Sequence, residues 1–355
     1  MSQLAAHFRE TVSGRRRGPV AACERALLRL AAIPYGRAVA LRNRYYDNPR
    51  HQRRVAAAVV SVGNLTLGGT GKTPFVAWLA RRLVEQGQRV ALVSRGYGAR
   101  PGARNDEARE LELALPDVPH VQNPNRVAAA EQAILSYGAQ CIVMDDGFQH
   151  RRLARDLDIV LVDALEPLGL GHLFPRGTLR EPLAGFARAD VIVLSRADLV
   201  DAECRATIRR QIETLAPRAT WVEAVHQPLR LRSLAGTDQP LTSLAGQRVA
   251  AFCGIGNPPA FARALKRLDC ELIGLRTFAD HWTFSPDDLA TLGQWAAAEQ
   301  AMLVCTLKDL VKIDPAWLNE RPVWALEIGL AITAGERQLL ERLKSLAPPS
   351  PLGEC

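Results

Sequence analysis

The sequence predicts an α/β protein: a doubly wound, mostly parallel sheet, a second, smaller α/β domain and an N-terminal amphipathic helix. Short apolar runs alternate with segments of helical spacing from residue 55 onward. A wholly apolar run is typical of a strand that is buried on both faces of a parallel sheet. The second domain is predicted because this alternation stops at residues 228–247 and then starts again.

The first alternation supplies the larger domain. After the first strand and a glycine-rich loop, residues 74–85 have helical spacing, and Gly87 stands where a glycine commonly ends a helix. Because strands and helices follow one another in turn, the strands are expected to run parallel. The predicted strands are 55–62, 89–94, 140–144, 158–162 and 190–195, and the predicted helices are 74–85 and 127–136.

The second alternation follows a stretch of short polar turns that contains Gly236, Pro240 and Gly246. Turn residues of this kind are typical of a connection between domains. The strands predicted here are 248–253, 271–277, 301–306 and 322–328, and the helices are 258–268 and 286–298. The predicted organisation is therefore a basic N-terminal segment (1–50), a larger domain (51–235), a smaller domain (236–345) and a disordered tail (346–355).

The composition is that of a globular protein in a reducing compartment. Hydrophobic residues make up 48% of the chain and charged residues 23%, which are ordinary values for a folded domain. The seven cysteines are odd in number and none are spaced as CxxC, so we expect free thiols and neither a disulfide framework nor a zinc site. The sequence shows no run of 18 apolar residues and no signal-peptide pattern.

The positive charge is concentrated at the N-terminus. Residues 1–54 hold twelve arginines and three acidic residues, so this segment accounts for more than the whole net charge of +8. Residues 19–46 fit an amphipathic helix broken near Pro34, which either lies on an anionic membrane surface or packs on the protein's own core. Nucleic acid is not expected as a partner, because no binding motif accompanies the arginines.

A glycine-rich loop carries the clearest chemical signal. The segment GNLTLGGTGKTP (63–74) follows a predicted buried strand and opens a predicted helix. Backbone N–H groups of Gly68, Gly69, Thr70 and Gly71 can surround phosphate oxygens there, at the positive end of the helix. Such a loop is typical of a P-loop NTPase-like fold. The alternative is a glycine-rich turn that binds nothing.

Two residues at the end of this loop have specific expected roles. Lys72 would neutralise the β- and γ-phosphates of a nucleotide, and Thr73 would offer its hydroxyl to Mg²⁺. The loop departs from the usual GxxxxGK[ST] pattern, because Thr66 occupies the position of the first glycine.

Paired acids follow another predicted strand. In IVMDDGFQH (142–150), Asp145 and Asp146 stand at the carboxyl end of an apolar run. In a P-loop sheet, this is where a carboxylate holds Mg²⁺ or its water shell. The alternative is a solvated DG turn, but two adjacent acids favour a functional role.

Further polar groups lie in predicted loops. Arg95 in SRGYG (94–98) could stabilise phosphate charge or form a surface ion pair. Asp106 and Glu107 could cap the helical stretch that follows them. His281 in FADHWTF could relay a proton for an aspartate base, although a lone histidine is more often structural.

A last predicted strand ends in CTLKDLVKI (305–313). Its Lys308, Asp309 and Lys312 could contact acidic substrate groups or remain solvated.

Taken together, these motifs resemble the tetraacyldisaccharide 4′-kinase family of lipid A synthesis. The likeness extends from about residue 27 to residue 328, and that family's loop also lacks the first glycine. NDEARELELA departs from the family's GDEP-type run at Asn105 and Ala108. The matching segments are GNLTLGGTGKTP, SRGYG, the acidic pair at 106–107, DDGFQH, PRGTLREPL, FADHWTF and CTLKDLVKI.

The resemblance implies an activity, a site and a location. The γ-phosphate of ATP would be transferred to the 4′-hydroxyl of a tetraacylated glucosamine disaccharide 1-phosphate, giving lipid IVA. Asp106 and His281 would form the dyad that activates this hydroxyl, while Asp145 and Asp146 would serve Mg²⁺ and catalytic geometry. The N-terminal helix would attach the enzyme peripherally to the cytoplasmic face of the bacterial inner membrane.

Two other classes of protein fit parts of the pattern. One is a P-loop regulatory ATPase or GTPase at the membrane, and SRAD (195–198) is faintly similar to a guanine-reading loop. The other is a membrane adaptor that kept a nucleotide fold without catalysis. A regulatory switch would hydrolyse nucleotide slowly without an acceptor, whereas a kinase would need its lipid acceptor for rapid turnover.

Overall fold

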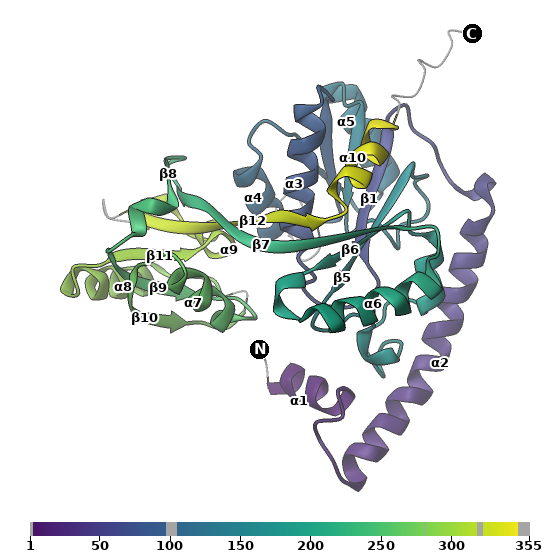
Figure 1. Cartoon of the computed structure of the whole chain (residues 1–355), viewed down its shortest axis with the longest axis horizontal. Helices are drawn as coiled ribbons and strands as arrows, with labels where there is room; N and C mark the ends of the chain where they lie inside the picture. Colours follow the sequence, from purple (N-terminus) through teal and green to yellow (C-terminus); the bar gives the residue numbers. More distant parts are fainter. Residues whose placement is uncertain (1–2, 97–104, 281, 318–321, 347–355) are drawn as a thin grey trace. The chain divides into compact units, whose positions relative to one another are not determined.

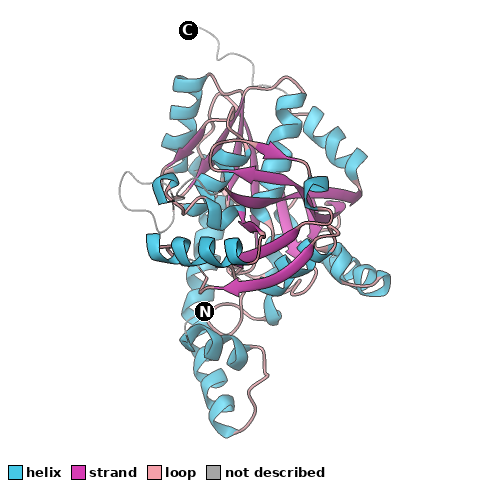
Figure 2. Cartoon of the chain, turned by 90° about the vertical axis from the view of Figure 1, so that its left-hand side faces the viewer, coloured by secondary structure: helices cyan, strands magenta, loops and turns pink. Residues whose placement is uncertain are grey.

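The computed structural model describes residues 3–96, 105–280, 282–317 and 322–346. The chain divides into two compact units, each of which interleaves helices and strands (Figures 1 and 2). The larger unit comprises residues 2–99, 115–225 and 330–355, and the smaller unit comprises residue 1, 100–114 and 226–329. The expected tail, 346–355, lies almost wholly outside the described residues.

The larger unit contains a parallel sheet. Its strands follow the order β7-β6-β5-β1-β4-β2-β3, and every registered pair among them is parallel. Strand β1 lies between β5 and β4, and all seven of its residues are buried. The strands are β1 (Ala58–Asn64), β2 (Val90–Ser94), β3 (His120–Gln122), β4 (Cys141–Asp145), β5 (Leu157–Asp163), β6 (Val191–Ser195) and β7 (Thr220–Ser233).

Helices pack on this sheet through apolar side chains. Alanines of α5 join residues of β1, β2 and β4 in one buried cluster, and Ile208 and Ile212 of α6 join β5 and β6 in another. Helix α5 begins where Asn125 accepts a hydrogen bond from the Ala128 amide and ends at Gly138 in the left-handed conformation. The helices are α3 (Lys72–Glu85), α5 (Arg126–Tyr137), α6 (Ala202–Leu215) and α10 (Glu336–Lys344).

The smaller unit has its own strands in the order β10-β9-β11-β12, paired in parallel. The long strands β7 and β12 each run from one unit into the other. The remaining elements are β8 (Asp238–Gln239), β9 (Arg248–Cys253), β10 (Glu271–Thr277), β11 (Met302–Thr306), β12 (Val323–Ala334), α4 (Asp106–Ala114), α7 (Pro258–Lys266), α8 (Pro286–Ala298) and α9 (Leu307–Leu310).

The structure confirms the predicted α/β fold class and the predicted strands and helices to within a few residues at most of their ends. The sequence analysis missed α6 and β7. It also placed all of 51–235 in one domain, whereas residues 100–114 and 226–235 group with the smaller unit. As expected, the described cysteines are free, and Cys141, Cys253 and Cys305 are buried.

The predicted break of the N-terminal helix near Pro34 is wrong. Helix α2 (Pro19–Asp47) runs through Pro34 without interruption, after the short α1 (Gln3–Val12). In the described part of the chain, no helix is long and apolar enough to cross a membrane. Helix α2 is fixed by specific contacts: Tyr35 donates to the Arg180 carbonyl at 2.7 Å, and Arg151 pairs with Asp47 at 2.8 Å.

A buried carboxylate organises the smaller unit. Asp309 has no exposed surface and accepts hydrogen bonds from the Gly254 amide (2.9 Å), the Thr306 hydroxyl (2.6 Å) and Lys312 (3.1 Å). It therefore joins the start of α9 to the chain that follows β9. The prediction that this segment remains solvated is wrong for Asp309 and Lys312, because their side chains are buried and pair with each other at 3.1 Å.

We expect Asp309→Ala to destabilise the protein, because Lys312 would be left as a buried charge without its partner. The free energy of unfolding should fall by about 3 kcal/mol. Urea unfolding followed by tryptophan fluorescence measures this change. The matched control is Asp287→Ala in the exposed first turn of α8, which should cost about 0.5 kcal/mol. Equal midpoints for the two variants would contradict this role of Asp309.

Candidate active site

The glycine-rich loop connects β1 to α3 in the larger unit. Strand β1 ends at Asn64 and the helix begins at Lys72. Gly68 (φ 116°) and Gly71 (φ 81°) have positive φ angles that side chains rarely adopt. The loop thus brings backbone amides to the N-terminus of α3, which is the geometry that favours a phosphate group.

Hydrogen bonds to neighbouring segments fix the position of the loop. The Ser195 hydroxyl donates to the Thr70 carbonyl, and Arg196 donates to the Gly69 carbonyl, both at 2.7 Å. The Leu67 amide donates to the Thr178 carbonyl at 2.6 Å. The segment that is faintly similar to a guanine-reading loop therefore begins with two residues that support the phosphate loop.

Lys72 lies at the centre of a charged cluster. Its Nζ is 3.1 Å from Asn64 Oδ1 and 3.3 Å from Asp146 Oδ1, and its side chain is only 15% exposed. Asp146 also accepts from Arg180 Nη1 through both carboxylate oxygens, at 2.9 and 2.8 Å. Burial tends to raise the pKa of Asp146, but Lys72 and Arg180 lower it overall, so the group is ionised at neutral pH.

Asp145 and Thr73 stand beside this cluster. Asp145 is the last residue of β4, is buried, and pairs in register with Val62 of β1, while Thr73 is the second residue of α3. Carboxylate and hydroxyl oxygens are donors that Mg²⁺ accepts. In the described residues, no group of three or more His, Cys, Asp or Glu side chains could hold a metal alone.

Buried polar residues form hydrogen bonds that hold the groups around Lys72 in place. Gln149 donates to the Asn64 carbonyl (2.8 Å) and to Glu181 (2.9 Å). Glu181 has no exposed surface and is neutralised by Arg188 at 2.8 Å. Because Asn64 contacts Lys72, this network sets the position of the ammonium group.

A second basic group lies in the larger unit, near the end of β2. Arg126 is 4% exposed, and neither its Nε nor His150 Nε2 has a hydrogen-bond partner among the described residues. Burial lowers the pKa of His150 to about 4, and the charges of Arg126 and Arg155, with a contribution from Arg95, act in the same direction. The buried guanidinium of Arg126, beside a histidine that stays neutral, attracts an anion, so this group is suited to a phosphate.

The remaining candidates belong to the smaller unit. Asp106 and Glu107 are the first two residues of α4, but the side chain that caps this helix is Asn105, which accepts from the Ala108 amide at 3.0 Å. The capping interpretation of Asp106 is therefore not needed. Burial raises the pKa of Glu110 to about 7, although Lys308 opposes the shift.

His281 lies outside the described residues. Its neighbour Asp280 is 3.1 Å from Lys308.

Comparison with known proteins decides the family. The family model described as tetraacyldisaccharide-1-P 4′-kinase matches residues 24–347. The chain belongs to this family. It is 41% identical over 347 residues to the tetraacyldisaccharide 4′-kinase of Anaeromyxobacter dehalogenans strain 2CP-C, covering 92% of this chain and 88% of the relative. The corresponding enzyme of Halothermothrix orenii is 37% identical, covering 84% and 86%.

A solved structure supports the fold. The crystal structure of LpxK from Aquifex aeolicus, in complex with ATP, has a TM-score of 0.73 and 26% identity, covering 91% of this chain and 99% of that one. The comparisons confirm the predicted resemblance, the α/β fold class and the enzyme class, a kinase.

In this member of the tetraacyldisaccharide 4′-kinase family, the candidate site also contains residues that were not singled out from the sequence. Arg180, Glu181 and Gln149 complete the cluster around Lys72, and they lie in PRGTLREPL and DDGFQH, two segments that carried the resemblance. Arg126 had no sequence signal, because a single arginine that opens a helix is common.

We expect His150 to titrate near pH 4, well below an unperturbed histidine, because the surrounding arginines oppose a further positive charge. Since its folded pKa is below its unfolded pKa, protonation of His150 favours unfolding as the pH falls from about 6.5 to about 4. An NMR pH titration of the ring, assigned with His150→Gln, measures the value. A midpoint above pH 6 would contradict the proposed electrostatics.

Proposed function

We propose that this kinase transfers the γ-phosphate of ATP to the 4′-hydroxyl of a tetraacyldisaccharide 1-phosphate, the step of lipid A biosynthesis that forms lipid IVA. One observation supports this above the others. In a chain of this family, the ammonium group of Lys72, the first residue of α3, is held between Asn64 at the end of β1 and Asp146 after β4.

The triphosphate of ATP binds across the loop. Amides of Gly68, Gly69, Thr70 and Gly71 surround the phosphates, and Lys72 turns from Asp146 to the β- and γ-phosphates. Arg180 then keeps Asp146 neutralised after Lys72 has moved, because it contacts both oxygens of that carboxylate.

The Thr73 hydroxyl and Asp145 would hold Mg²⁺. When bound, the ion neutralises charge on the phosphates. Asp146 holds the Lys72 ammonium group at the loop before ATP binds, so its part is to keep this cation in place for the phosphates.

The acceptor is a phosphorylated lipid, and two groups of residues suit it. Asp106, with His281, accepts the proton of the 4′-hydroxyl as the phosphate is transferred. Arg126 and Arg95, with the neutral His150, form an anion-attracting group in the larger unit. We assign the phosphate of the acceptor to this group.

Helix α2 attaches the enzyme peripherally to the cytoplasmic face of the inner membrane. Only Ala21 and Val39 of its described side chains are buried, which does not favour a helix that serves the protein's own core. Large apolar side chains are exposed instead, and arginines accompany them. The most exposed are Leu41 (69%), Val20 (65%), Leu30 (63%) and Leu27 (62%).

The direct test is incubation with labelled ATP and an acylated disaccharide 1-phosphate, followed by separation of the lipids. A kinase places the label on the lipid at the 4′ position and turns over ATP rapidly only when the acceptor is present. A regulatory ATPase or GTPase would hydrolyse nucleotide at the same slow rate with and without the lipid, and would leave it unlabelled.

We expect Lys72→Ala to abolish transfer, with kcat/KM lower by at least about 10³-fold, because the cation that faces the transferred phosphate is lost. Radiometric assay of the lipid product measures this loss, and circular dichroism shows whether the variant is folded. Arg81→Ala, on a later turn of α3, is the control and should retain activity. Transfer at the normal rate by folded Lys72→Ala would refute the assignment.

We expect Asp106→Asn to lower kcat by about 10²- to 10⁴-fold while the ATP dissociation constant changes little, because a general base acts only in the chemical step. Steady-state kinetics and equilibrium ATP binding separate the two effects. Glu107→Gln removes the adjacent charge and should keep most of the activity. If both variants lose kcat equally, Asp106 is not the specific base.

A further inference from the structure

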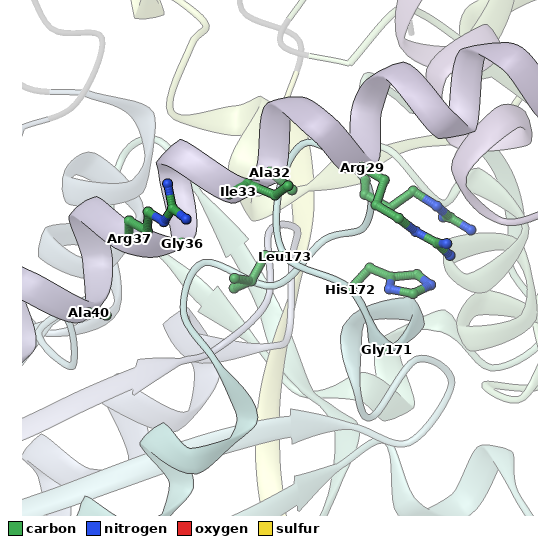
Figure 3. A pocket seen from close by; sticks show the side chains of 10 residues that line it. Arg29, Ala32, Ile33, Gly36, Arg37, Ala40, Gly171, His172 and Leu173 are labelled. Atoms are coloured by element: carbon green, nitrogen blue, oxygen red, sulfur yellow. The ribbon is translucent and has the colours of Figure 1, made fainter.

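A cavity of about 440 Å³ lies between α2 and residues 171–176 of the larger unit. Figure 3 shows its two walls: Ile33 and Arg37 come from the helix, and Leu173 faces them from the other segment. Arg29 and His172 lie next to each other at one end of the cavity. Its lining includes none of the residues that surround Lys72, so it is separate from the phosphate loop.

The charged side chains that line the cavity are all basic, and its lining includes no acidic side chain. Arg29, Arg37 and Arg176 all contribute to the walls. Within the described ranges of the chain, none of these three arginines forms an ion pair with a carboxylate. Arg176 donates to the Val12 carbonyl at 3.1 Å, but its Nε is buried and has no hydrogen-bond partner in the described structure. The partly buried Arg176 guanidinium therefore retains a donor without a partner among the described residues.

The charges also crowd one another. Burial lowers the pKa of Arg176, and the nearby charges of Arg29 and Arg25 lower it further. The pKa of His172 is lowered for the same reasons, by burial and by Arg176 and Arg29. An anion in this cavity would relieve the repulsion, and arginine forms paired hydrogen bonds with phosphate oxygens.

Both segments that form the cavity carry exposed apolar side chains. At about 100° per residue, Leu30 and Leu41 lie on the side of α2 roughly opposite Ala21 and Val39, and both leucines are exposed. Ile33, in the cavity wall, is 47% exposed. Phe174 is 39% exposed. A cationic pocket with exposed apolar residues beside it has the arrangement of a site at the level of lipid headgroups.

We propose that this pocket binds the phosphate of an anionic phospholipid headgroup, with Arg29 and Arg176 as its direct ligands. The proposal rests on the membrane attachment proposed above and adds a defined partner, a phospholipid of the surrounding bilayer and not the disaccharide substrate. The volume is adequate, since small-molecule sites typically measure about 300 to 1,000 Å³.

Binding to vesicles tests the proposal against simple charge attraction. The full chain is sedimented with vesicles of phosphatidylcholine, and with the same vesicles containing phosphatidylglycerol. The double variant Arg29→Gln/Arg176→Gln is compared with Arg42→Gln/Arg44→Gln, which removes two exposed arginines of α2 outside the cavity. Both variants lose the same charge, and ATP binding shows that each remains folded.

We expect the pocket variant, Arg29→Gln/Arg176→Gln, to bind phosphatidylglycerol vesicles about tenfold more weakly than the control variant, Arg42→Gln/Arg44→Gln. Both variants lose two positive charges, but only the pocket variant loses the proposed phosphate ligands. Equal weakening of the two variants would overturn the pocket and leave the membrane attachment intact. If the unaltered chain shows no preference for the acidic vesicles, the pocket proposal fails, whereas binding to both kinds of vesicle would still support attachment through apolar side chains. Absence of binding to any vesicle would refute both.

A fourth outcome separates the two sources of lipid phosphate. If the pocket variant binds phosphatidylglycerol vesicles as well as its control, but its KM for the disaccharide 1-phosphate in detergent rises, the cavity serves the substrate. That result would overturn the assignment to a bilayer phospholipid.

Discussion

The larger unit is organised around one ammonium group. Lys72 is largely buried, and a buried cation is stable only with partners that offset its lost hydration. Asn64 and Asp146 provide these partners from the ends of β1 and from the turn after β4. Their positions depend in turn on Gln149, Glu181 and Arg180. The position of Lys72 in this short glycine-rich loop therefore depends on polar residues from several segments of the larger unit.

Residues 169–181 connect this cluster to the N-terminal helix. The Thr178 carbonyl holds the phosphate loop, and the Arg180 side chain holds Asp146. In the same segment, the Arg180 carbonyl accepts from Tyr35 of α2, and His172 and Arg176 line the cavity beside that helix. The segment that contacts the proposed nucleotide site is therefore also the one against which the proposed membrane helix packs. Arg176 and Arg180 therefore have different surroundings, because Arg176 lines the cavity beside α2 whereas Arg180 contacts Asp146.

The sequence allowed prediction of those features that local chemistry determines. The buried strand, the glycines and Lys72 predicted a phosphate loop, and the structure places this loop between β1 and α3. Strand β7 was missed because buried and partly exposed residues are mixed along its length. Helix α6 was missed because its apolar face is short and the helix carries many charged residues. Pro34 was interpreted as a break, although helices tolerate a proline where the lost hydrogen bond and local bend are accommodated. The partners of Lys72 could not be predicted, since Arg180 and Gln149 lie far from it in sequence.

The most direct test is a crystal structure of the full chain with a non-hydrolysable ATP analogue and Mg²⁺. The account predicts that the β- and γ-phosphates lie within hydrogen-bonding distance of the amides of the 68–73 loop and of Lys72 Nζ, with Asp146 still paired to Arg180. A nucleotide bound elsewhere, or one whose phosphates leave Lys72 on Asp146 and the loop amides uncontacted, would contradict it.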